Sequence, residues 1–322
     1  MKQTGRGTDD NMERFYQDDP HHYDTGLMRI GCSRGQAEAH AALLRGLRRR
    51  YYSLIGAVAS HLRGGQESVR ILDVGCGLGE DIQGLSRLIP GAQFVGIEIS
   101  PSAIEVCNRT KGPESTFLCG RVDELPLGER SFDLVVSFCV LEHVGALPEF
   151  FAACGKLLRQ GGAMVAAVPS PSYWWWWNWP RYAVARALRR NVVLHAASRG
   201  QLRDAVERAG LHTAWRDRLG FRPPQEFFRH VPEERLPTVA RHFERAGEAL
   251  RGTRFASLLY LDLYVWTTDR LAFPDDRPNH PTGVGGWQAA LAIPYLACWW
   301  GRAAADMAQQ ALRRAVRAFG GK

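Results

Sequence analysis

Apolar residues recur along the chain with two alternating periods, one typical of a helix and one typical of a strand. Residues 36–62 place apolar side chains, Tyr51 among them, at three- and four-residue steps, which predicts an amphipathic helix. Its other face carries Arg45, Arg48, Arg49 and Arg50. Short β-branched runs follow at 69–74, 93–99, 132–138 and 163–169, separated by segments long enough for helices. This alternation predicts βαβ units and a parallel sheet with helices on both faces.

The second half of the chain continues the alternation less regularly. We expect a helix at 199–209, a strand at 212–219, a helix at 233–250 and a strand at 257–267. The last of these strands is apolar throughout most of its length, so we expect it inside or beside the sheet.

Three parts follow from this pattern. Residues 1–68 are expected to form an N-terminal lid and a cap helix, and residues 69–270 the main α/β domain. A segment rich in Trp and Arg, 171–198, is expected as an insertion in that domain, and 271–322 as an apolar and amphipathic tail.

The charge and the cysteine content bear on the partners and the cellular compartment of the protein. The chain has 322 residues and a net charge of +8, but only four of its 41 basic residues are Lys. An anionic partner and an Arg excess from GC-rich coding both explain this charge. The seven Cys are odd in number and form no C-x-x-C pair, which argues against a disulfide framework or zinc ribbon. With no apolar leader at the N-terminus, we expect a cytoplasmic protein.

Three glycines alternate directly after the first β-branched run. Gly75, Gly77 and Gly79 lie between that strand and the next predicted helix, where the missing Cβ atoms let a ligand approach the backbone. Their spacing differs from the dinucleotide-binding G-x-G-x-x-G, and no phosphate-binding G-K-[ST] follows. Because such turns also occur as structural corners, the glycines alone do not identify a ligand.

An acidic residue, Glu98, ends the second run beside this turn. Its carboxylate there can accept hydrogen bonds from both hydroxyls of a ribose. The alternative is a capping carboxylate for the helix that begins near Pro101. Together, the turn and Glu98 predict a nucleoside-containing ligand.

From Val69 to Thr267 the chain resembles the class I S-adenosylmethionine-dependent methyltransferases, in the small-molecule branch with quinone, sterol and other lipid-type substrates. The resemblance rests on the glycine turn and Glu98 and continues through 123–127, 131–144 and 158–162. It implies a Rossmann-like α/β fold with a mostly parallel seven-stranded sheet, a helical N-terminal cap and a C-terminal helical appendage. It also implies S-adenosyl-L-methionine as cofactor.

The resemblance further implies which residues bind the cofactor. They are Asp73, Gly75, Cys76, Gly77, Gly79, Glu98, Ile99, Val122, Asp123, Ser137 and Phe138. Asp73 and the glycine turn would hold the methionine portion and Glu98 the ribose. Ile99 would cover the adenine face.

The remaining implied contacts lie in the segment around Val122 and Asp123 and at the end of the 132–138 strand. Val122 and Asp123 would line the adenine edge, while Ser137 and Phe138 would face the sulfonium and the acceptor. Arg121 stands where the family often has an acidic residue, which makes Asp123 the candidate substitute for the usual contact to the adenine amino group.

His143 is the candidate catalytic base. Methyl transfer needs mainly alignment, but a hydroxyl acceptor must also lose its proton. His143 follows the 132–138 strand, and imidazole titrates near neutrality. In the alternative interpretation, Glu142 and His143 begin the next helix and His143 only packs or caps there.

We therefore expect methyl transfer to a small, apolar or lipid-like acceptor, with oxygen favoured over nitrogen and carbon, and release of S-adenosylhomocysteine. Methylation of nucleic acid is a rival suggested by the positive charge, but no RNA-binding module and no Asn/Asp-Pro-Pro-Tyr/Phe box is present. A non-catalytic cofactor-binding scaffold is a second rival, and the intact Asp73, glycine turn and Glu98 argue against it. The adjacent His21 and His22 lie in an irregular segment, so no metal site is expected.

Two segments suggest contact with a membrane. Residues 281–301 carry no charge and are rich in aromatic residues, and 302–319 combine an apolar face with arginines. Five Trp lie between Trp174 and Trp179, and indole is favoured at lipid headgroups. These features predict peripheral association at the inner face of the membrane. Burial of the Trp residues, and a tail packed on the catalytic domain or on a second subunit, are the open alternatives, and the oligomeric state is open as well.

Overall fold

The computed structural model describes residues 34–64, 68–172, 198–221, 231–251 and 259–270, together with Phe227 and Ala256. The predicted lid, most of the insertion including Trp174–Trp179, and the tail from 271 lie outside the described residues.

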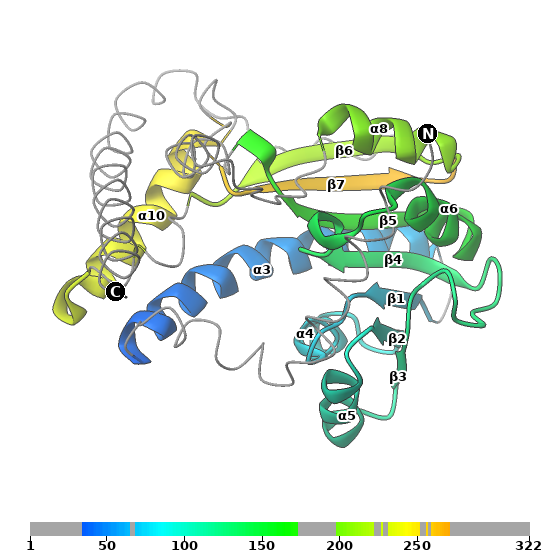
Figure 1. Ribbon diagram of the computed structural model, residues 1–322, viewed down its shortest axis with the longest axis horizontal. Coiled ribbons are helices and arrows are strands. Elements are labelled where there is room, and N and C mark those ends of the chain that lie inside the picture. Colours follow the sequence, from blue (N-terminus) through cyan, green and yellow to red (C-terminus); the bar gives the residue numbers. More distant parts are fainter. Residues whose placement is uncertain are drawn as a thin grey trace, which may run out of the picture.

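Within the described part, the strands form one seven-stranded sheet in the order β3-β2-β1-β4-β5-β7-β6. The strands are β1 (Arg70–Val74), β2 (Gln93–Glu98), β3 (Ser115–Cys119), β4 (Phe132–Phe138), β5 (Leu158–Pro169), β6 (His212–Leu219) and β7 (Leu261–Thr267). Strands β1 to β5 are parallel, and β7 lies between β5 and β6, antiparallel to both (Figure 1). The predicted mostly parallel seven-stranded fold is confirmed.

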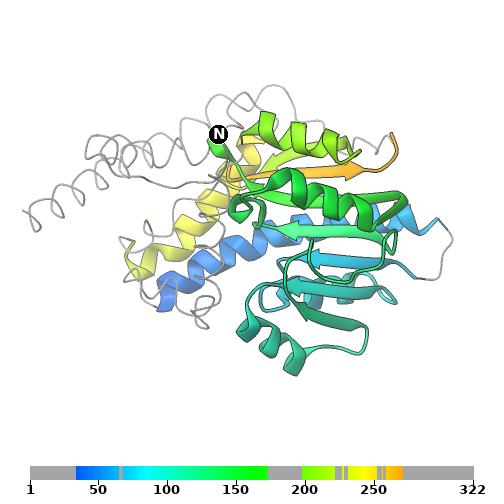
Figure 2. The same cartoon turned by 45° about the vertical axis from the view of Figure 1, so that its right-hand side comes forward.

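Helices cover both faces of this sheet. They are α3 (Arg34–Arg63), α4 (Glu80–Leu88), α5 (Pro101–Thr110), α6 (Leu147–Leu157), α8 (Arg199–Arg208) and α10 (Leu236–Leu250), with the 3-10 turns η1 (Leu141–His143) and η2 (Glu233–Arg235). Buried side chains of α3, α4, α5 and α10 form one apolar cluster with the sheet, and those of α6 and α8 form another on the opposite face. Figure 2 shows the long α3 (blue) passing behind the strands with α10 (yellow) alongside it.

Local sequence explains where these elements begin. At the start of α5, the Ser100 hydroxyl accepts a hydrogen bond from the Ala103 N–H at 3.4 Å, and Pro101 occupies the first turn, where a missing N–H costs nothing. At the start of α8, Ser198 and Gln201 form a reciprocal capping box. Both helices therefore start at residues whose side chains satisfy the exposed N–H groups.

The predicted elements differ most from the observed ones in three places. The sequence pattern missed β3, an edge strand in which only Ser115 and Phe117 are buried, so it has no apolar run. The predicted strand 163–169 begins five residues earlier, at Leu158, through an irregular pairing with β4. The predicted strand 257–267 begins at Leu261. No helix among the described residues has both the length and the apolarity to cross a membrane.

Candidate cofactor site

The carboxyl ends of β1, β2 and β4 meet at the middle of one edge of the sheet. The chain runs outward from β1 through β2 to β3 and then returns to the other side of β1 as β4. Asp73 is consequently in register with Gly96 on one side and Val136 on the other. In open α/β sheets, ligands bind at the point where the strand order reverses.

The glycine turn begins where β1 ends and leads into α4. Gly75, Gly77 and Gly79 have φ values of 77°, 53° and 77°, in the left-handed region that strains residues with a side chain. A Cβ on Gly75 would also collide with the side chain of Val140. The N–H groups of Gly75 and Cys76 both donate to the Ile97 carbonyl, at 2.8 and 3.0 Å. The turn is therefore anchored to β2 and has a backbone that only glycine fits.

Glu98 lies against this turn at the end of β2 and is buried. Its carboxylate accepts hydrogen bonds from the N–H groups of Gly77 at 3.1 Å, Ile99 at 2.8 Å and Ser100 at 3.1 Å. A carboxylate has roughly four acceptor positions, so capacity remains for a ligand hydroxyl. The side-chain cap of α5 that was the alternative for Glu98 is provided by Ser100, through its bond from Ala103.

Asp73, the acidic residue near the end of β1, is buried and has a carboxylate oxygen without a hydrogen-bond partner. It is 2% exposed, and its Oδ2 accepts no hydrogen bond. Burial and then the nearby Asp81 carboxylate raise the pKa of Asp73 well above its usual range, while the Arg48 guanidinium opposes this rise. A buried acceptor without a partner costs free energy until a donor reaches it. A cationic donor group placed here would satisfy Asp73.

Helix α3 contributes side chains to this region that the sequence analysis did not assign to it. Arg48 pairs with Glu80 and, at 3.3 Å from its Nε, with Asp81 at the start of α4. Its guanidinium carbon also lies 5.3 Å from the centre of the Phe138 ring. The Tyr52 hydroxyl donates to Asp81 at 2.7 Å. Arg48, which the sequence pattern placed on the face opposite the apolar residues, thus reaches the start of α4 and the Phe138 ring.

Tyr51, in α3, binds the backbone near the end of β4 through its hydroxyl. Its hydroxyl accepts a hydrogen bond from the Ser137 N–H at 2.9 Å and donates one to the Val165 carbonyl at 3.2 Å. Its ring lies 5.1 Å from that of Phe138. Burial raises the pKa of the Tyr51 hydroxyl well above its usual range, so it stays protonated and able to donate. The Ser137 hydroxyl is buried without a hydrogen-bond partner.

The residues predicted to contact the adenine follow β2 and β3. Ile99 is half-buried directly after Glu98, and Val122 is buried after β3. The exposed Asp123 pairs with Arg121, whose Nε lies 3.2 Å from its Oδ1. Arg121 thus forms an ion pair with the Asp123 carboxylate, the candidate contact to the adenine amino group.

His143 ends the 3-10 turn η1 beyond β4 and is half-buried. Its N–H donates to the Val140 carbonyl at 2.8 Å. Because α6 begins only at Leu147, the alternative in which His143 starts that helix is wrong. Between β4 and this turn, Cys139 has a left-handed backbone, with φ of 56°, held by its N–H bond to Ala167 at 2.8 Å. A non-glycine residue in this conformation is often part of a functional site, and no sequence pattern announces it.

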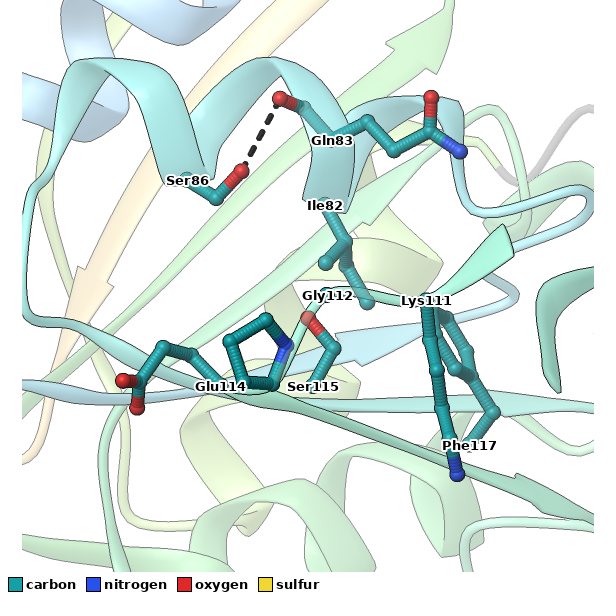
Figure 3. A pocket seen from close by; sticks show the side chains of 9 residues that line it. Ile82, Gln83, Ser86, Lys111, Gly112, Glu114, Ser115 and Phe117 are labelled. Atoms are coloured by element: carbon teal, nitrogen blue, oxygen red, sulfur yellow. Dashed lines mark hydrogen bonds between the residues drawn. The ribbon is translucent and has the colours of Figure 1, made fainter. Parts of the chain in front are cut away.

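A shallow pocket of about 130 Å³ lies elsewhere, between α4 and the segment 111–117 (Figure 3). Ile82, Gln83 and Ser86 line one side, and Phe117 and its neighbours line the other. None of the predicted site residues lines this pocket. It therefore carries no evidence about the cofactor site.

Comparisons with known proteins converge on this part of the chain. Residues 72–166 match the family model described as a methyltransferase domain. A ubiquinone biosynthesis O-methyltransferase of Rhodopseudomonas palustris (strain BisB5) is 34% identical over 122 residues, which are 36% of this chain and 44% of that protein. A phthiotriol/phenolphthiotriol dimycocerosates methyltransferase of Mycobacterium leprae (strain TN) is 33% identical over 104 residues, or 32% and 38% of the two chains. The chain spans less than half the length of these curated relatives.

The solved structures support the fold. Geranyl diphosphate C-methyltransferase from Streptomyces coelicolor A3(2) superposes with a TM-score of 0.52 at 14% identity, over 81% of this chain and 98% of that one. The matched domain contains the glycine turn, and this turn lies where the strand order of the seven-stranded sheet reverses. Residues 72–166 therefore match a methyltransferase domain, and the chain shares the fold of a solved S-adenosylmethionine-dependent methyltransferase.

Proposed function

We propose that this protein transfers the methyl group of S-adenosylmethionine to oxygen of a small, apolar or lipid-like acceptor. The observation that carries the proposal is the pairing of a buried Glu98 with the glycine turn, next to the unsatisfied Asp73. A ribose and a cationic amino group are the ligand groups that these two carboxylates suit.

The donor set fits the cofactor. Glu98 would accept a hydrogen bond from a ribose hydroxyl with its remaining acceptor capacity, and Asp73 would accept one from the ammonium of the methionine portion. The bare backbone of Gly75 to Gly79 lets that portion approach closely. When bound, the cofactor supplies a sulfonium methyl group with a good leaving group. The chain has to hold it and align the acceptor.

Ser137, Phe138 and His143 then face the acceptor. Tyr51 holds the end of β4 in place and so orients Ser137 and Phe138. The His143 imidazole would accept the proton of the acceptor hydroxyl. Oxygen is favoured because a relative of the domain is named as an O-methyltransferase.

The acceptor class is inferred from two sources. The relatives named for ubiquinone biosynthesis and for phthiotriol dimycocerosates support a quinone- or lipid-type acceptor. The sequence features of 281–319 and Trp174–Trp179 support a location at the inner face of the membrane, where such an acceptor resides. We also propose that the chain divides into an N-terminal lid and cap helix, a catalytic domain and a C-terminal tail.

One assay tests the proposal against its rivals. The purified full chain is incubated with labelled S-adenosylmethionine and, separately, a hydroquinone, a phenolic lipid and total RNA, and product masses are measured. We expect label on the hydroquinone or the lipid with equal release of S-adenosylhomocysteine. Label on RNA alone would support the nucleic-acid rival, and cofactor binding without transfer to any acceptor would support the scaffold.

A further inference from the structure

Two buried thiols lie at the glycine turn, one in the turn and one in the helix packed against it. Cys76 belongs to the turn itself and Cys107 to α5. Both sulfur atoms lie near the Gly77 carbonyl oxygen, at 3.9 Å for Cys76 and 3.3 Å for Cys107. The two side chains therefore converge on one carbonyl oxygen of the turn. Residues 31 positions apart in the sequence thus form one dithiol.

The space around this dithiol is tightly filled. A Cβ on Gly96, in the strand beneath the turn, would come within 2.9 Å of the Cys76 sulfur. A Cβ on Gly79 would lie 3.3 Å from the Cys107 sulfur and 3.2 Å from the Phe117 ring. The thiols therefore pack between the turn and α5, so any movement of one sulfur is transmitted to the backbone of the turn.

We propose that Cys76 and Cys107 form an oxidisable dithiol, which hydrogen peroxide converts to a disulfide in the cofactor-free protein and which then blocks the cofactor site. The proposal rests on the proposed function insofar as the turn binds the cofactor. The disulfide itself does not depend on that function.

The chemistry balances with peroxide as the oxidant. The side chain of Cys76 lowers the pKa of the Cys107 thiol, which makes its sulfur the nucleophile. This sulfur attacks one peroxide oxygen, the O–O bond breaks, and water leaves a sulfenic acid on Cys107. The Cys76 sulfur then attacks the Cys107 sulfur, the S–O bond breaks, and a second water leaves with the remaining thiol proton.

The geometry explains the effect on binding. A disulfide brings the two sulfur atoms to about 2.05 Å, well inside their non-bonded separation. Cys76 is next to Gly77, whose N–H donates to Glu98, so pulling Cys76 toward α5 disturbs that bond. Bound cofactor keeps the turn in its reduced position and protects the pair.

The test combines peptide mapping with binding. The reduced full chain is treated with hydrogen peroxide with or without S-adenosylhomocysteine, free thiols are alkylated, and non-reduced peptides are identified by mass spectrometry. We expect a linked Cys76–Cys107 peptide that is suppressed by S-adenosylhomocysteine. We also expect at least a tenfold loss of cofactor affinity by calorimetry, reversed by dithiothreitol.

Two variants provide the controls. Cys107→Ser should bind cofactor within threefold of the unsubstituted protein when reduced and should keep that affinity after peroxide. Cys119→Ser removes an exposed thiol and should remain peroxide-sensitive. If the linked peptide does not form while exposed thiols are oxidised, or if Cys107→Ser loses affinity equally, the dithiol proposal is wrong. If the reduced protein binds no cofactor, the proposed function fails, while peptide mapping still decides the dithiol.

Discussion

The Tyr51 hydroxyl accepts a hydrogen bond from the backbone N–H of Ser137 at 2.9 Å, although 86 residues separate them in the chain. The same hydroxyl donates to the Val165 carbonyl of the adjacent strand, so one side chain of α3 satisfies backbone groups on β4 and β5. The N-terminal helix is therefore part of the structure that shapes the carboxyl end of β4.

Tyr51→Phe should destabilise the protein while keeping its packing. Removing the hydroxyl leaves a buried N–H and a buried carbonyl unsatisfied, at a cost of about 1 to 3 kcal/mol. Urea unfolding followed by circular dichroism measures this difference. Tyr52→Phe is the matched control. The half-buried Tyr52 hydroxyl bonds the Asp81 carboxylate and the Glu80 carbonyl, so its loss should cost less than the loss of the fully buried Tyr51 hydroxyl. Equal midpoints for Tyr51→Phe and the unsubstituted protein would remove Tyr51 from this role.

Local patterns in the sequence predicted the central strands and the turn, because the residues that form each of them are neighbours in the chain. The buried runs of β1, β2 and β4 and the alternate glycines can be recognised within a few residues. The partners of Tyr51 cannot, since they lie 86 and 114 residues away. Periodicity correctly placed Tyr51 on the apolar face and Arg48 on the opposite face, but it did not indicate the partners of either residue. It could not see that α4 begins there with Glu80 and Asp81.

Glu98→Ala should weaken cofactor binding. Loss of the ribose hydrogen bonds to a charged acceptor should cost on the order of 2 to 4 kcal/mol, or about 30- to 900-fold in Kd. Calorimetric titration with S-adenosylhomocysteine measures it. Glu105→Ala removes an exposed carboxylate of α5 and should leave the affinity unchanged. An unaltered Kd for Glu98→Ala would refute the assignment of Glu98 to the ribose.

Asp73→Asn should stabilise the cofactor-free protein and weaken its binding of cofactor. The folded-state pKa of Asp73 is raised, so the folded protein binds more protons than the unfolded one at intermediate pH. Stability then falls as pH rises above the unfolded pKa of about 4 toward the raised folded value. Asn cannot ionise, so this loss should be absent from the variant.

Thermal unfolding from acidic to neutral pH, with and without S-adenosylhomocysteine, measures both effects of Asp73→Asn. The melting temperature of the variant should exceed that of the unsubstituted protein increasingly toward neutral pH without ligand. The stabilisation by ligand should be smaller in the variant, since the ammonium loses an ionised partner. Parallel pH profiles for the two proteins would show that Asp73 does not titrate differently in the folded state.

His143→Ala should lower turnover of a hydroxyl acceptor by about 100-fold or more while cofactor affinity stays unchanged, because a general base acts in the chemical step and not on the cofactor. The sharpest measurement compares two phenolic acceptors of different acidity. With an acceptor whose hydroxyl is already ionised at the assay pH, no proton remains to be removed, so the variant should recover most of the lost rate. His61→Ala, at the exposed C-terminal end of α3, is the control and should behave as the unsubstituted protein. If His143→Ala slows both acceptors equally, His143 positions η1 rather than accepting the proton. If it slows neither, the base is another residue near the end of β4.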